Sequence, residues 1–269
     1  MTLDELTVVR ASPGMTWRAR AGGSVVGSAT AFLRPDDRWE VRLDHESRPD
    51  SRAPLIAAVA ANVQADLHAV AGEKNSEALR YWAELGFAVN RREGIYLIPT
   101  DPARHRLGAA GVPDDIVVFS ARDADTDDLR LLDDALRQDV PGTDGWQWDP
   151  ADFNEETYGS SDFDPATYLV AADASVGEYI GLARVWVGPG RPRLGLIAVK
   201  PKYRRLGLSR AMLTRVFAVL HERGVSEVSC EADDSNAAAL RLLAGFGARR
   251  INGMVMLIRR QHAASVSQD

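Results

Sequence analysis

The stretch that decides the fold of this chain is residues 196–213, LIAVKPKYRRLGLSRAML. An apolar run leads into a basic turn, and an amphipathic helix begins near Leu208. The turn therefore lies at a helix N-terminus, where backbone amides have no partner within the helix and the helix dipole is positive. Gly207 lets the backbone approach a ligand closely. This combination predicts a cradle for a pyrophosphate group; the alternative is an ordinary loop before a helix.

Strands and helices are expected on both sides of this stretch. In the C-terminal part, the expected strands are residues 116–120, 168–172, 179–187, 193–199 and 225–231, and the expected helices are residues 127–138, 208–223 and 237–246. A last hairpin is expected at residues 248–259, with its turn at Asn252-Gly253. In the N-terminal part, the expected strands are residues 6–11, 15–20, 24–33, 39–43 and 94–98, and the expected helices are residues 55–63 and 75–85.

An internal repeat divides the chain into two copies. Residues 75–87, NSEALRYWAELGF, align without gaps on residues 236–248, NAAALRLLAGFGA, and six of the 13 positions are identical. Upstream and in the same order, residues 26–29 match residues 180–183. Two matches in one order favour a duplicated fold. We expect domains at residues 1–100 and 115–260, a linker at residues 101–114, which contains two prolines, and a disordered tail at residues 261–269.

Composition excludes several classes of protein. The 269 residues are 45% hydrophobic and 26% charged, as in ordinary globular proteins. No apolar run approaches the ~18 residues that span a bilayer, and the N-terminus lacks the apolar segment of a secretory signal. The single cysteine, Cys230, fits a reducing compartment. The chain is therefore expected to be cytoplasmic and not to bind a membrane, and its net charge of −6 argues against binding nucleic acid.

The charge is distributed unevenly along the chain. Residues 111–178 carry 18 acidic and 3 basic side chains, whereas residues 179–269 carry 15 basic and 6 acidic ones. Neighbouring surfaces of opposite charge suit two ligands of opposite charge; the alternative is that each run is a solvated face.

Two motifs in the C-terminal copy resemble those of the GNAT superfamily of acyl-CoA-dependent N-acyltransferases. In residues 199–209, VKPKYRRLGLS, Arg204 and Gly207 match the family's loop signature, and Ser209 departs modestly from it. In residues 236–248, most of the second signature is present, but Leu243 replaces its tyrosine. The resemblance implies an α/β (α+β) fold with two tandem GNAT-like domains, each a mixed, mostly antiparallel twisted sheet flanked by helices.

The resemblance also implies a site for acetyl-CoA or another acyl-CoA, without a metal. In that family, backbone groups of the fourth strand hold the pantetheine arm, the loop holds the pyrophosphate, and an asparagine helps to orient the cofactor. The corresponding residues here are Ile197, Ala198, Val199, Arg204, Arg205, Leu206, Gly207, Leu208, Ser209 and Asn236.

Two catalytic residues are expected from the family's mechanism, which is direct acyl transfer to a neutral amine. The general base is assigned to Glu231, five residues before Asn236; its alternative role is a strand-end carboxylate paired with an arginine. Because Leu243 cannot supply a proton, Tyr203 is the candidate acid, chosen only because it is near in the sequence.

The first copy lacks the features that bind the cofactor. Its equivalent segment, residues 45–53, reads HESRPDSRA, in which Ser51 replaces the glycine and Pro49 removes an amide. We expect a degenerate domain, in the manner of tandem enzymes such as mycothiol synthase, which have one working half.

The acceptor is expected near residues 146–158, where aromatic side chains alternate with acidic ones. Trp146, Trp148, Glu155 and Tyr158 suit an amine on an apolar or ring-bearing body; the alternative is that the aromatic residues pack helices onto the sheet. The chain is thus expected to be an N-acetyltransferase that acts on a small cationic amine. The alternatives are a protein lysine or N-terminal acetyltransferase and a non-catalytic acyl-CoA-binding module.

Overall fold

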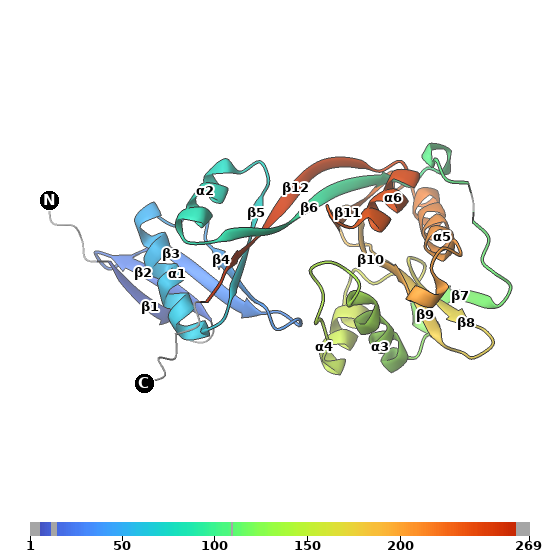
Figure 1. Cartoon of the computed structure of the whole chain (residues 1–269), viewed down its shortest axis with the longest axis horizontal. Helices are drawn as coiled ribbons and strands as arrows, with labels where there is room; N and C mark the ends of the chain where they lie inside the picture. Colours follow the sequence, from blue (N-terminus) through green and yellow to red (C-terminus); the bar gives the residue numbers. More distant parts are fainter. Residues whose placement is uncertain (1–5, 12–14, 109, 262–269) are drawn as a thin grey trace, which may run out of the picture. The chain divides into compact units, whose positions relative to one another are not determined.

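The computed structural model of the chain describes residues 6–11, 15–108 and 110–261 (Figure 1). The chain forms two compact units. The first unit comprises residues 1–92 and 253–269, and the second comprises residues 93–252. Strands β6 (Ala88–Pro99) and β12 (Arg249–Arg259) each contribute residues to both units.

The first unit is a sheet with two helices. Its strand order is β1-β2-β3-β4-β5-β12-β6. Among the strand pairs described in this unit, only β4 with β5 is parallel, and the others are antiparallel. The remaining elements are β1 (Thr7–Ala11), β2 (Thr16–Ala21), β3 (Ser24–Leu33), β4 (Trp39–Leu43), β5 (Leu67–Gly72), α1 (Pro49–Val63) and α2 (Ser76–Glu84). Trp17, Leu55 and Trp82 lie in its core.

The second unit has the strand order β6-β11-β10-β9-β8-β7. Only the β10–β11 pair is parallel among the pairs described. Its elements are β7 (Ile116–Ser120), β8 (Tyr168–Asp173), β9 (Tyr179–Trp186), β10 (Arg193–Val199), β11 (Glu227–Asp233), α3 (Thr126–Arg137), α4 (Pro150–Asn154), α5 (Leu208–Glu222) and α6 (Ala237–Gly245).

The two faces of this second sheet have separate cores. Helices α5 and α6 pack on one face with Val185, Leu194 and Val199. Helices α3 and α4 pack on the other face with Tyr168 and Leu196. The split follows from the alternation of side chains along strands, which sends neighbouring residues to opposite faces.

The prediction of a hairpin at residues 248–259 is wrong, because β12 is one continuous strand. Neither Asn252 nor Gly253 has the positive φ that a two-residue hairpin turn requires. Residues 254–259 instead pair with residues 67–72 of β5. Figure 1 shows β12, in red, beside β5 and β6, which come from the first half of the chain.

The boundary between the two compact units therefore lies within strands β6 and β12. The sequence analysis had placed it in a linker at residues 101–114. Residues 101–114 all belong to the second unit. Residues 93–99 of β6 pair with residues 227–233 of β11. Each half of the chain thus supplies a strand to the unit formed mainly by the other half. Of the expected tail, residues 262–269 lie outside the described residues.

Two further elements differ from expectation in the first unit. Helix α1 begins at Pro49, because proline is well tolerated in the first turn of a helix. Strand β5 was not expected, although its alternate residues Leu67, Ala69 and Ala71 are buried. Within the described residues, none of the helices has the length and apolar character that crossing a membrane requires.

Candidate functional site

The loop between β10 and α5 has the backbone of an anion cradle. Gly207 is the N-cap residue of α5 and has φ +83°, which is readily adopted by glycine. Arg205 also has a positive φ, 67°. No side chain caps this end of the helix. The first amides of α5 are therefore available to a ligand, and the pyrophosphate of an acyl-CoA fits the residues present.

Arg204 holds this loop in place within the protein. Its Nε donates to the carbonyl oxygen of Val199 at 2.9 Å, and its guanidinium pairs with Asp139. Arg205 and Leu206 are exposed. The charge of Arg204 is partly offset by Asp139, so the backbone amides and Arg205 are the better-placed anion ligands.

Strands β10 and β11 diverge beside this loop. They pair only at Arg193–Ser229 and at Leu194–Cys230. From Gly195 onward no residue of β10 pairs with β11, and a β-bulge interrupts the ladder between β10 and β9 there. Ile197, Ala198 and Val199 lie on this length, which pairs with β9 but not with β11. Their role in binding a pantetheine arm stays a prediction.

Glu231 lies on β11, next to the last β10–β11 pair. Arg193 Nε donates to Glu231 Oε2 at 2.9 Å, which is the arginine-paired alternative of the sequence analysis. The carboxylate is still partly exposed, at 24% of its side chain. Its neighbour Cys230 is buried, and burial raises the pKa of its thiol to about 12, so this thiol is a poor nucleophile near neutral pH.

Tyr203 is engaged in a contact that the sequence did not predict. Its hydroxyl donates to Asp173 Oδ2 on β8 at 2.8 Å. This hydrogen bond and burial raise the pKa of Tyr203, which makes it a weaker acid. Leu243, at the position of the family tyrosine, is buried against α5 in the core.

Asn236 caps a helix. Its side chain accepts from the amide of Ala239 at 3.0 Å, at the start of α6. Asn75 makes the same contact with Ala78 at 2.9 Å at the start of α2. Capping therefore accounts for this asparagine in both copies.

The expected acceptor residues lie on the face covered by α3 and α4. The rings of Trp146 and Trp148 meet edge to face at 5.2 Å, and Arg137 lies over the Trp146 ring at 4.6 Å. Tyr158 donates to the carbonyl oxygen of Ala121 at 3.0 Å. Glu155 is exposed. The Tyr158 hydroxyl is therefore engaged within the protein, whereas Trp146 and Trp148 are each partly exposed.

A buried ion cluster on the same face was missed by the sequence analysis. Asp133 on α3 accepts hydrogen bonds from Arg137, from Arg184 Nη1 at 3.0 Å and from Trp148 Nε1 at 2.9 Å. Burial raises the pKa of Asp133, but the guanidiniums of Arg184 and Arg137 outweigh this and lower it overall. The sequence feature that could have predicted this cluster is Arg184, a charged residue within the otherwise apolar strand β9.

The equivalent of the cradle is closed in the first unit. Ser51 is fully buried within α1, and its hydroxyl donates to the carbonyl oxygen of Arg48 at 2.8 Å. Arg48 precedes the helix and pairs with Asp50. No glycine turn opens toward a ligand in this segment, consistent with a degenerate copy.

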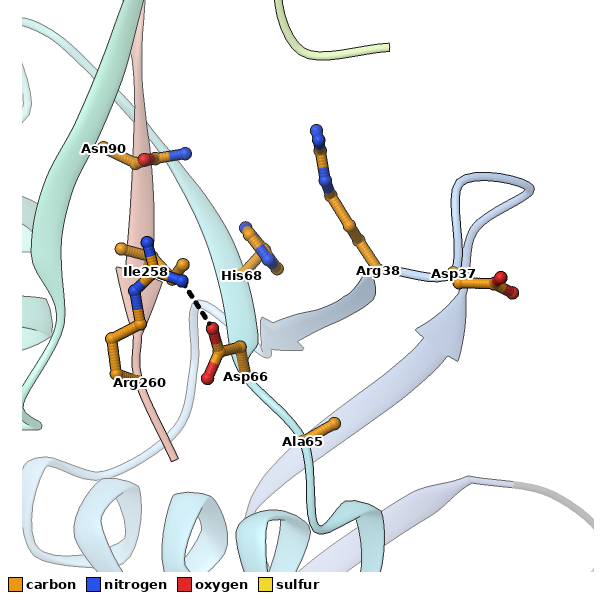
Figure 2. Close-up of a pocket in the computed structure, with 8 residues that line it drawn as sticks. All are labelled: Asp37, Arg38, Ala65, Asp66, His68, Asn90, Ile258 and Arg260. Atoms are coloured by element: carbon orange, nitrogen blue, oxygen red, sulfur yellow. Dashed lines mark hydrogen bonds and ion pairs between the residues drawn. The ribbon is translucent and has the colours of Figure 1, made fainter. Parts of the chain in front are cut away.

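The first unit has a pocket of about 350 Å³ elsewhere (Figure 2). It lies at the N-terminal ends of β4 and β5, whereas α1 follows the C-terminal end of β4. Its lining residues are Asp37, Arg38, Ala65, Asp66, His68, Asn90, Ile258 and Arg260. Asp66 accepts from Arg260 at 2.8 Å. Burial, with Arg38 and Arg34 nearby, lowers the pKa of His68.

Comparisons with known proteins give a matching family model for part of the chain and similar folds for the whole of it. Residues 130–248 match the model of the Acetyltransferase (GNAT) family. A GCN5-related N-acetyltransferase from Sphaerobacter thermophilus is 19% identical, with a TM-score of 0.70 over 95% of this chain and 83% of that one. A tandem GNAT protein from the clavulanic acid biosynthesis pathway is 17% identical, with a TM-score of 0.64 over 93% and 83%. None of the curated proteins matches the chain.

At these identities the solved structures are informative about the fold alone. Their coverage extends over both units, so the fold of the whole chain resembles that of a tandem protein. Within the described residues, no group of three His, Cys, Asp or Glu side chains could hold a metal ion.

Proposed function

Because residues 130–248 are an acetyltransferase domain of the GNAT family, we propose that this chain transfers an acetyl or other acyl group from an acyl-CoA to a small cationic amine. The observation that carries the proposal is the open N-terminus of α5, with Gly207 at its cap, beside the divergence of β10 and β11. This arrangement combines an anion cradle with a length of β10 whose edge toward β11 is unpaired. In the first unit, β4 and β5 also pair at only two positions, Trp39–Leu67 and Glu40–His68, but no glycine cradle follows β4.

The proposed cofactor ligands follow the loop and the strand before it. Backbone groups of residues 197–199 bind the extended arm, and residues 204–209 bind the pyrophosphate, with Asn236 nearby as a helix cap. When bound, an acyl-CoA supplies the acyl group as a thioester. The exposed side chain of Arg205 adds positive charge to the cradle.

Glu231 is the proposed general base. An ammonium group must lose its proton before its nitrogen can act as a nucleophile. Glu231 is the carboxylate next to the point where β10 and β11 part, and a quarter of its side chain is accessible. Arg193 would orient it there. With the Cys230 thiol held protonated, direct transfer is preferred to a route through an acyl-cysteine.

Tyr203 is the proposed acid, but it is poorly arranged for the task. To donate a proton elsewhere, its hydroxyl must first leave Asp173. A CoA thiolate is a fairly good leaving group, so we expect the acid to contribute less than the base.

The cationic acceptor is supported by the charge around α3 and α4. Exposed acids occur in the first turn of α3 and at Glu155 and Glu156. Trp146 and Trp148, which are partly exposed, add aromatic surface, which attracts cations. We therefore place the amine on this face of the second unit.

One observation favours a different function. Leu243 is buried and Tyr203 is hydrogen-bonded, so no tyrosine hydroxyl at either position is free to act as the acid. This would suit a module that binds acyl-CoA without catalysis. Acetylation of a protein lysine or N-terminus is the third candidate.

Measuring thiol release from acetyl-CoA with a panel of amines separates these candidates. We expect release with small cationic amines and one CoA site per chain by calorimetry. Binding without release from any amine or peptide would favour the module. Release with peptides alone would favour the protein acetyltransferase, and absence of CoA binding would refute all three.

A further inference from the structure

Two side chains of β9 have no role in the function proposed above. Arg184 and Trp186 alternate along this strand and therefore share the face covered by α3 and α4. The guanidinium of Arg184 lies 5.0 Å from the centre of the Trp186 ring and 5.6 Å from that of Tyr168. The three side chains form a stack, which we call the β9 stack.

The β9 stack reaches the point where β10 leaves β11. A Cβ atom on Gly195 would lie 2.9 Å from Trp186 Nε1 and 3.5 Å from Arg184 Nε. Gly195 lies at the bulge of β10 and is the first residue beyond its last pair with β11. The lack of a side chain at Gly195 lets the indole and the guanidinium approach the proposed site of acyl transfer.

Two buried polar groups of the stack, which interact electrostatically with each other, are poorly satisfied by hydrogen bonds. Arg184 Nε and the Tyr168 hydroxyl are buried, and within the described chain neither makes a hydrogen bond of good geometry. Their residues are only 4% and 1% exposed. Trp186 Nε1 also donates to none of the described residues, although its ring is partly exposed. Buried polar groups in folded proteins are usually paired, so this arrangement points to a ligand.

Beneath the stack, Arg184 shares its carboxylate partner with a second guanidinium. The carboxylate of Asp133 is shared between the guanidiniums of Arg137 and Arg184, and all three side chains are at most 10% exposed. The next carboxylate, Asp134, pairs with Arg130 at 3.4 Å. Arg130 also pairs with the exposed Asp127 at 3.8 Å, so three carboxylates face three guanidiniums in this network. Arg184 nevertheless shares its one carboxylate partner with Arg137. A carboxylate of a ligand at the stack would give Arg184 a second partner.

We propose that the β9 stack binds a carboxylate of the acceptor, and that the acceptor is a basic amino acid or a close analogue. The inference rests on the function proposed above, since it concerns the acceptor of that reaction. Trp186 Nε1 donates to the carboxylate, and the guanidinium of Arg184 lies beneath it as a positively charged partner. Such a molecule is cationic overall, because it has two amines and one carboxylate, and it agrees with the acidic surface of α3 and α4.

Matched pairs of acceptors test this proposal. L-Lysine and cadaverine differ only in the carboxylate, as do L-ornithine and putrescine. With the full chain and acetyl-CoA, we expect the amino acids to have kcat/KM values at least about tenfold above those of their diamines, since hydrogen bonds to charged groups are among the strong ones. Trp186→Phe keeps the ring and removes the N–H, and should cut this preference by about tenfold through KM. Trp39→Phe, on β4 of the first unit, is the matched control and should leave the preference intact.

A second measurement does not depend on turnover. The indole N–H resonance of Trp186, identified by its loss in Trp186→Phe, should shift when L-lysine is added to the CoA-bound protein and should not shift with cadaverine. If that resonance does not shift on addition of L-lysine, the carboxylate site is refuted, although acetyl transfer can still stand. Equal kcat/KM values of the wild-type protein for lysine and cadaverine would refute it in the same way. A shift without any acetylation would instead leave the site standing and refute the transferase. CoA affinity should be equal in the wild type and Trp186→Phe; a loss there would assign the indole to the cofactor and overturn the proposal.

Discussion

Arg184 Nη1 on β9 donates to Asp133 Oδ2 on α3 at 3.0 Å, and the two residues are 51 positions apart in the chain. Both side chains are almost completely buried, at 4% and 0% exposed. The pair joins the helix layer on the proposed acceptor side to the central strands of the second sheet. It also fixes the guanidinium beneath Trp186, so the stability of this unit and the shape of its proposed site depend on the same contact.

Replacing Asp133 by Asn should destabilise the second unit strongly. The change would leave two buried guanidiniums without a carboxylate, and breaking a buried ion pair from one side costs about 3–5 kcal/mol. Urea unfolding followed by tryptophan fluorescence measures the loss. Asp128→Asn, an exposed acid in the first turn of the same helix, is the control and should cost no more than about 1 kcal/mol. Equal losses in the two variants would mean that the buried pair is energetically unimportant.

Gly207→Val should weaken CoA binding by about five- to a hundredfold. A β-branched residue at φ +83° introduces about 1–3 kcal/mol of strain, and its Cβ would also lie 3.2 Å from the Cβ of Ala110. Calorimetry should give one site per chain in the wild type. Gly224→Val, at the other end of α5 with φ +78° and open space around it, should lose stability but keep its CoA affinity. Two equivalent sites per chain would contradict the degenerate first copy.

Glu231→Gln should lower turnover by about 10²-fold at pH 7, with CoA affinity nearly unchanged. The deficit should shrink as the pH rises, because more of the amine is then neutral without help. Arg193→Gln removes the partner and keeps the carboxylate, and should cost much less turnover. If both variants turn over like the wild type and lose equal stability, Glu231 is only the structural partner of Arg193.

Stability should fall as the pH is lowered below about 6.5, and His68 should contribute to the slope. The folded pKa of His68 is lowered by burial and by Arg38 and Arg34, so the unfolded chain binds the proton first. The loss begins near the ordinary value of 6.5 and ends below the folded value. His68→Gln should flatten this part of the profile, whereas His45→Gln, at an exposed position, should not. Identical slopes in the wild type and His68→Gln would remove His68 as the cause.

Specificity constants for cationic acceptors should decrease as salt increases. Exposed acids on α3 and at Glu155 and Glu156 would attract an ammonium group, and 0.1 M salt screens such attraction beyond about 10 Å. Measurements from about 0.02 to 0.5 M sodium chloride with a fixed amine test this. Constants that do not change with salt, or a best acceptor that is anionic, would show that the acidic run is only a solvated face.

Local features of this chain could be predicted well from the sequence. The loop at residues 199–209, the start of α5 after Gly207 and the strands β3, β4, β7 and β10 were placed correctly. Each depends on residues close together in the chain: a glycine that adopts a positive φ, an alternating pattern, a helix dipole. The two asparagine caps also follow from local sequence, although their role as caps became clear only from the hydrogen bonds.

The tertiary structure alone decided which strands pair and which charges meet. Asn252-Gly253 carries the sequence of a hairpin turn, yet β12 continues as one strand through it, because β5 offers its backbone a partner nearly 200 positions away. Likewise, Glu231 meets Arg193, Tyr203 meets Asp173, and Arg184 meets Asp133 across 38, 30 and 51 positions. No local pattern encodes such contacts, because their energy depends on burial and on a partner that only the folded sheet brings within reach. The sequence by itself therefore indicated the glycine loop before α5 and the resemblance to the GNAT family, whereas folding determined which side chains are engaged with one another around that loop.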